Sequence, residues 1–67
     1  MQNIPWYERI KQARLSRCLS QRAAAALLEV DEKTYQRWEA GKSLPNYAGR
    51  RALRDCFGIS SDLIPPL

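Results

Sequence analysis

Residues 32–40 offer charged and polar side chains at spacings that suit the binding of a partner molecule rather than catalysis. Tyr35 and Trp38 are three residues apart, which marks the buried face of a helix. The other side of that helix carries a carboxylate, an ammonium, an amide and a guanidinium, from Glu32, Lys33, Gln36 and Arg37. These groups donate and accept hydrogen bonds and carry charge. The segment therefore predicts a surface that binds a polar partner.

The charge of the chain agrees with an anionic partner. Eleven Lys and Arg residues outnumber seven Asp and Glu residues, so the formal net charge is +4 and the isoelectric point is about 9.5. A basic domain of this kind is one footprint of nucleic-acid binding. A basic surface also serves solubility or an acidic protein partner, so the charge supports this interpretation without deciding it.

The combinations of residues that catalysis or metal binding needs are missing from the sequence. The chain has no histidine, no Gly-rich phosphate loop and no paired carboxylates in an apolar setting. A lone Ser or Cys without a base is not a catalytic site. Cys18 and Cys56 are too few for a zinc site, and we interpret them as reduced thiols rather than redox sensors. We therefore expect no enzyme, no metal and no other cofactor.

The sequence also predicts no membrane segment. No apolar stretch approaches the roughly 20 residues that a membrane-spanning helix needs. Residues 1–5 lack the basic region followed by an apolar run that begins a signal peptide. We expect a cytoplasmic protein.

Helix signals dominate the chain and predict an all-α fold. Helices are expected over residues 6–17, 21–28, 32–40 and 47–57, followed by a short turn that holds Leu63 and Ile64. The helix boundaries are marked by Pro5 at a first helical position, by the N-caps Ser20, Asp31 and Asn46, and by the C-terminal stops Gly41 and Gly58. We predict a single domain over residues 1–67, a compact bundle of four to five short helices.

Residues 20–40 have the layout of a helix-turn-helix. Two helices of about eight residues are joined by a turn of about three. Their close crossing needs a small residue at the contact, and Ala25 is the candidate. The helix over residues 32–40 would project from the surface into the major groove of DNA, with its N-terminal residues reaching deepest.

The order of residues in this region resembles a known family. The shared pattern is Leu19-Ser20-Gln21, then Ala25, Leu28 and Val30, then Trp38-Glu39-Ala40-Gly41-Lys42 and Leu44-Pro45. It is similar to the helix-turn-helix domain of phage lambda-type repressors and Cro proteins, the Cro/C1 or XRE family. The resemblance begins near Arg9 and continues through Phe57-Gly58-Ile59-Ser60, so it covers nearly the whole chain.

The resemblance implies which residues meet the DNA bases. The base-contact candidates are Glu32, Lys33, Thr34, Gln36 and Arg37. Chemically, Lys33 and Arg37 favour guanine acceptors, and Glu32 accepts from cytosine N4. The alternative for Lys33 and Arg37 is an ordinary solvated helix face. Glu32, which is acidic, has a further alternative, in which it only excludes wrong bases or helps to cap the helix.

The resemblance also implies contacts to the DNA backbone and one structural ion pair. The backbone candidates are Gln21, Arg22, Lys42, Ser43 and Asn46. The family pairs an arginine of the first helix with the glutamate that ends the third. Arg14 and Glu39 match these positions and are expected to form a salt bridge.

Several residues depart from the family pattern. Glu29 stands where the turn often has Gly, so it is either strained in a left-handed conformation or part of a different turn. Cys18 also replaces a usual Gly. Tyr35 replaces Ile or Val, which implies an altered core or a partly exposed ring. The fourth helix carries Arg50, Arg51 and Arg54, which form either a second phosphate-binding patch or a solvated face.

The function expected first is sequence-specific binding of double-stranded DNA by a transcription regulator, a small repressor of the phage or plasmid type. Such proteins act as homodimers on palindromic operators, here in a bacterial nucleoid. The apolar tail over residues 63–67 is a candidate dimer surface, or it packs over the first helix. The alternative is an antitoxin or protein-interaction adaptor with the same fold and a partner such as a toxin.

Overall fold

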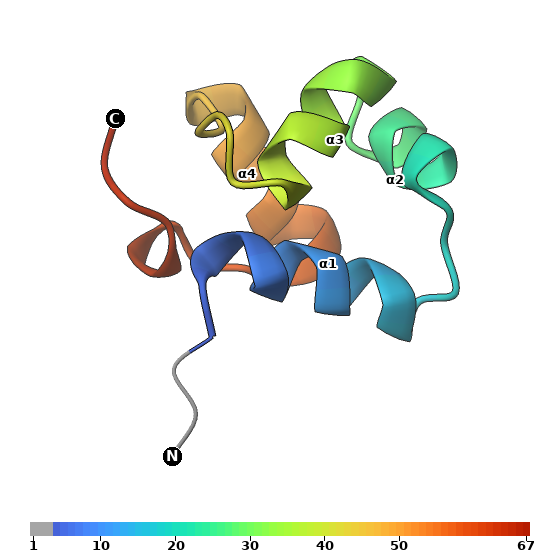
Figure 1. Ribbon diagram of the computed structural model, residues 1–67, viewed down its shortest axis with the longest axis horizontal. Helices are drawn as coiled ribbons and strands as arrows, with labels where there is room; N and C mark the ends of the chain where they lie inside the picture. The colour runs from blue at the N-terminus through green and yellow to red at the C-terminus, as the bar shows by residue number, and fades with distance from the viewer. Residues whose placement is uncertain (1–3) are drawn as a thin grey trace.

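The computed structural model describes residues 4–67 as a helical bundle without strands (Figure 1). The elements are α1 (Trp6–Ser16), α2 (Gln21–Leu27), α3 (Glu32–Glu39), α4 (Tyr47–Phe57) and a final 3₁₀ turn, η1 (Ser61–Leu63). The predicted all-α class is confirmed, and the four predicted helix ranges agree with the structure to within one residue at each end.

Short polar side chains begin three of the helices, as predicted. Ser20, Asp31 and Asn46 each accept a hydrogen bond from a backbone N–H two or three residues later, at 3.0, 3.1 and 2.8 Å. Such bonds satisfy amide groups that have no partner within the helix. Gly41 and Gly58 follow α3 and α4 with φ of 72° and 69°, the left-handed conformation predicted for both stops.

Pro5 occupies the N-cap position of α1 and not the first helical position, which was the prediction. It precedes α1 with φ −62° and ψ 156°, so its backbone is extended rather than helical. Its carbonyl accepts from the backbone N–H of Glu8 at 3.0 Å, which begins the helix. The proline ring fixes φ at a value that suits both positions, and the observed ψ places Pro5 in the cap.

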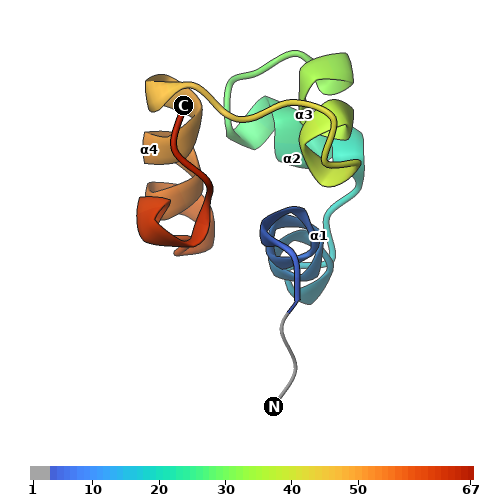
Figure 2. The same ribbon diagram turned by 60° about the vertical axis from the view of Figure 1, so that its left-hand side comes forward.

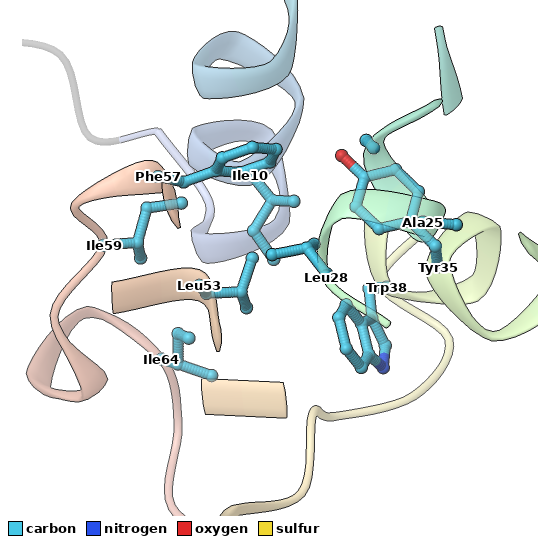
Figure 3. Close-up of a cluster of buried hydrophobic side chains, with 10 residues drawn as sticks. Ile10, Ala25, Leu28, Tyr35, Trp38, Leu53, Phe57, Ile59 and Ile64 are labelled. Carbon is cyan, nitrogen blue, oxygen red and sulfur yellow. The ribbon is translucent and has the colours of Figure 1, made fainter. Parts of the chain in front are cut away.

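The hydrophobic core joins all four helices (Figure 3). Tyr35 and Trp38 of α3 lie at one end of the cluster, and Phe57 and Ile59 lie at the other. Ala25 is 2% exposed, which agrees with its predicted role at the crossing of α2 and α3. The ring of Tyr35 is fully buried, so the predicted alternative of a partly exposed ring is wrong and the altered core is present.

Two residues other than glycine adopt left-handed backbone conformations where the family pattern has glycine. Glu29 has φ 59° in the turn between α2 and α3, and Cys18 has φ 56° between α1 and α2. The strained alternative predicted for Glu29 is therefore the one observed. A residue with a Cβ atom pays on the order of 1 kcal/mol in this conformation, because Cβ approaches the following carbonyl oxygen.

Replacing Glu29 by glycine is expected to raise the free energy of unfolding by about 1 kcal/mol, because glycine has no Cβ to strain the turn. Urea denaturation followed by circular dichroism measures the change. Glu29→Ala is the matched control, since alanine removes the carboxylate but keeps Cβ. Equal stabilisation by both substitutions would show that the carboxylate, rather than the backbone, is the source of the strain.

The C-terminal tail packs along α4 (Figure 2). Ile64 is buried in the core, whereas Leu63 and Leu67 are 43% and 65% exposed. The predicted alternatives for Arg50, a phosphate-binding patch or a solvated face, are both wrong because Arg50 is only 6% exposed. Its guanidinium bonds to backbone carbonyls of the tail, which explains why a charged side chain is buried here. Arg51 and Arg54 are exposed.

Candidate nucleic-acid interface

Helix α3 is held by its buried face and presents its polar face to solvent. Tyr35 and Trp38 are 0% and 3% exposed and fix the helix against α1 and α2, its neighbours in the fold. In Figure 1, α3 lies across the top of the molecule, above α1. The five base-contact candidates, Glu32, Lys33, Thr34, Gln36 and Arg37, are all exposed. The structure thus brings the whole predicted set together on one open helix surface.

One hydrogen bond on this surface restricts what two of its residues offer a ligand. Gln36 Nε2 donates to Glu32 Oε2 at 3.2 Å. This bond uses one of the two N–H groups of the Gln36 amide, so the second N–H and the amide oxygen are left for a ligand. The Glu32 and Gln36 pair therefore presents acceptor oxygens and one amide N–H donor, and Lys33 and Arg37 present further donors. Both kinds of group are needed to distinguish base pairs in a major groove.

The predicted backbone contacts flank α3 at its two sides. Arg22, Lys42 and Asn46 are exposed, whereas Gln21 and Ser43 are partly buried. Asn46 Oδ1 is occupied in capping α4, and its amide nitrogen has no hydrogen-bond partner within residues 4–67. This nitrogen can donate to an anionic oxygen without loss of the cap.

Gln21 contacts the end of α3. Its Nε2 donates to Glu39 Oε1 at 3.0 Å. This bond ties the start of α2 to the last residue of α3 and helps to hold α3 in place.

The salt bridge predicted between Arg14 and Glu39 is present. Arg14 Nε lies 2.7 Å from Glu39 Oε2 and Arg14 Nη2 lies 3.1 Å from Oε1, so the pair is bidentate. The side chains are 11% and 5% exposed. Arg14 Nη1 also donates to the backbone carbonyl of Leu19 at 2.9 Å. This network ties α1 and the start of α2 to the last residue of α3.

The network sets the protonation of its members. Burial acts to raise the pKa of Glu39, but the hydrogen bonds from Arg14 and Gln21 and the charge of Arg14 outweigh it and hold the pKa below its usual value. The hydrogen bond to Glu39 raises the pKa of Arg14. Burial raises the pKa of Tyr35 well above its usual value, and Glu39 adds to this effect. Near neutral pH the pair is ionised and Tyr35 keeps its proton.

Residues 4–67 contain no group of three or more His, Cys, Asp or Glu side chains arranged to hold a metal ion. Among the same residues, no helix has the length and apolar character needed to cross a membrane.

A family model described as helix-turn-helix matches residues 10–63. The chain belongs to the Cro/C1-type helix-turn-helix family. The matched span of this Cro/C1-type domain includes the base-contact set, the backbone-contact set and the Arg14 and Glu39 pair. Membership indicates a DNA-binding transcription regulator, and domains of this family are not typically enzymatic. A search of curated proteins and a search of solved structures each found no match.

Sequence reasoning missed the burial of Arg50. Arg50, Leu53 and Phe57 are spaced three and four residues apart, which places them on one helix face. This spacing was the available signal, and the charge of Arg50 hid it because arginine is usually solvated.

Proposed function

We propose that this Cro/C1-type domain is a sequence-specific transcription regulator, a small repressor that reads the major groove of double-stranded DNA with α3. The observation that carries the proposal is the single exposed face of α3 with Glu32, Lys33, Thr34, Gln36 and Arg37, held from behind by buried aromatic rings. In DNA-binding helix-turn-helix domains, the N-terminal residues of the second helix contact base edges. Thr34 and its neighbours occupy this part of α3.

The residues beside α3 would bind phosphates. Gln21 and Arg22 lie at the start of α2, and Lys42, Ser43 and Asn46 follow α3. Contacts of this kind set the register of a protein on DNA but carry no sequence information. With a net charge of +4, binding is expected to weaken steeply as salt rises, because each neutralised phosphate releases counterions.

The regulator would act as a homodimer on a palindromic operator. It would do so in the bacterial nucleoid, within the cytoplasm. The gene would belong to the bacterium or to a phage that infects it. Paired half-sites one helical turn apart require two recognition helices related by a two-fold axis. Leu63 and Leu67 of the tail remain exposed and offer apolar contact area for this assembly.

The proposal is tested by selecting binding sites from a pool of random-sequence duplexes and measuring affinities by fluorescence anisotropy. We expect Arg37→Ala to lose about 1–3 kcal/mol of preference for the selected sequence over a scrambled duplex, because a bidentate arginine–guanine contact supplies discrimination of that size. Arg22→Ala is the matched control. It removes the same charge from a predicted phosphate contact, so it should weaken binding to both duplexes equally.

Two results would count against the proposal. Failure of the chain to enrich any sequence from the pool would contradict sequence-specific recognition altogether. Enrichment with full preference retained in Arg37→Ala would assign the specificity to a different surface.

A second candidate, an antitoxin or protein-interaction adaptor, is favoured by one observation. Leu27 and Tyr47 are 49% and 83% exposed, and both border a hollow between the end of α2 and α4. Exposed apolar groups around a hollow are typical of protein-binding surfaces. An adaptor would tolerate loss of Lys33 and Arg37 but not of Leu27 and Tyr47.

A further inference from the structure

Arg50 of α4 is a buried cation whose hydrogen bonds go mainly to backbone carbonyl groups. Its Nε donates to the carbonyl of Pro45 at 2.9 Å. Its Nη1 lies 3.3 Å from Ser61 Oγ and 3.4 Å from the carbonyl of Ile64, and its Nη2 donates to the carbonyl of Pro65. Within residues 4–67, no carboxylate lies at ion-pair distance from it.

These bonds join two segments that are far apart in the sequence. Pro45 belongs to the loop between α3 and α4, whereas Ser61, Ile64 and Pro65 belong to the C-terminal tail. A guanidinium is planar and rigid, so acceptors bound to it are held at fixed directions from one another. Arg50 therefore fixes the end of the loop against the tail.

The loop over residues 42–46, which Arg50 holds in this way, carries three of the proposed phosphate contacts: Lys42, Ser43 and Asn46. Its first residue is fixed by the backbone bond from Lys42 N to the carbonyl of Arg37, at 2.9 Å. Its far end is fixed by Asn46, which caps α4, and by the bond from Arg50 to the carbonyl of Pro45. Ser43 lies between these two anchors. The backbone on either side of Ser43 is therefore held by hydrogen bonds.

We propose that Arg50 is a positioning residue for phosphate binding, which holds the loop over residues 42–46 in its DNA-binding conformation and uses the tail as a second support. The proposal rests on the DNA-binding function proposed above. Arg50 does not contact phosphate itself, because it is 6% exposed and all three of its nitrogen atoms are engaged. It acts through Lys42, Ser43 and Asn46.

The test compares Arg50→Lys with Arg51→Lys. Both substitutions keep the net charge of the chain, and Arg51 is the exposed neighbour on the same helix. Lysine carries one compact ammonium and cannot reach acceptors on both segments at once. Affinity for a fluorescein-labelled, mixed-sequence duplex is measured by anisotropy over a series of salt concentrations, and circular dichroism verifies that each variant is folded.

In Arg50→Lys, we expect the slope of log affinity against log salt to become shallower by about 1, because Lys42, the cationic side chain of the loop, loses its phosphate contact. The preference for the selected sequence over a scrambled duplex should stay unchanged, since α3 is not altered. Arg51→Lys should keep the wild-type slope. A folding defect alone would reduce the amount of active protein without changing the slope, so this readout separates positioning from stability.

A wild-type slope in folded Arg50→Lys would overturn the inference. If Arg50→Lys does not fold, Ser61→Ala decides, because it removes one acceptor and leaves Arg50 in place. We expect Ser61→Ala to weaken binding by about threefold at low salt, the effect of one lost hydrogen bond, and wild-type affinity at every salt concentration would overturn the inference. Wild-type protein that binds no duplex would instead contradict the proposed function, which is a different result.

Discussion

Replacing Glu39 by alanine is expected to lower the free energy of unfolding by about 3–5 kcal/mol, the usual effect of removing one partner from a buried ion pair. Arg14 would be left without its carboxylate while only 11% of its side chain is exposed. Gln21 would lose its acceptor as well. A domain of this size has a total stability of only about 3–10 kcal/mol, so the expected loss is a large fraction of the total.

The chain offers a matched control for this prediction. Arg54 and Asp55 form the other ion pair within residues 4–67, at 3.3 Å, and their side chains are 65% and 58% exposed. Asp55→Ala is expected to change the free energy of unfolding by less than about 1 kcal/mol, because water screens an exposed pair. Urea denaturation followed by circular dichroism compares the two variants at one pH. Equal losses in Glu39→Ala and Asp55→Ala would show that burial adds nothing to the Arg14 and Glu39 pair.

The parts of the fold that sequence predicted correctly are set by local chemistry. Ser20, Asp31 and Asn46 cap helices because a short side-chain oxygen reaches the free N–H groups two or three residues ahead. Gly58 stops α4 because it adopts positive φ without strain. Each rule involves only residues close in the chain, so the pattern of residue types was enough to place these boundaries.

The parts that sequence missed depend on contacts between distant segments. Arg50 is buried because backbone carbonyls of Pro45 and the tail converge on it. Every residue carries a carbonyl, so no residue type marks where carbonyls will gather. Tyr35 is fully buried for a related reason, since the space around its ring is set by the packing of α1 and α2 on α3.

In the candidate site, too, local features could be predicted from the sequence and contacts between distant residues could not. The exposed face of α3 followed from the three-residue spacing of Tyr35 and Trp38. The Arg14 and Glu39 pair joins positions far apart in the chain and was expected only because the family resemblance supplied it. The hydrogen bond between Gln36 and Glu32 spans a single helical turn, but side-chain conformation decides whether it forms. Its effect on the groups available to DNA comes from the structure alone.

Trp38→Ala is expected to lower the free energy of unfolding by about 3–5 kcal/mol, the range for removing a large aromatic side chain from a core. Trp38 is 3% exposed, and its ring lies 6.1 Å from that of Tyr35 in an edge-on arrangement. A Cβ on Gly49 would lie 2.7 Å from Trp38 Cη2 and 3.2 Å from Pro45 Cβ, so the indole fills the space between α3 and α4. Alanine would leave a cavity at this junction.

Tyr47→Ala is the control, because Tyr47 is also aromatic and lies nearby on α4 but is 83% exposed. Its loss should change the free energy of unfolding by no more than about 0.5 kcal/mol. A similarly small change in Trp38→Ala would mean that the junction collapses to fill the cavity.

The junction connects the face of α3 to the loop over residues 42–46, so base reading and phosphate binding share one buried support. Trp38→Ala should therefore weaken binding to the scrambled duplex and also lower the preference for the selected sequence, unlike Arg37→Ala, which mainly lowers the preference.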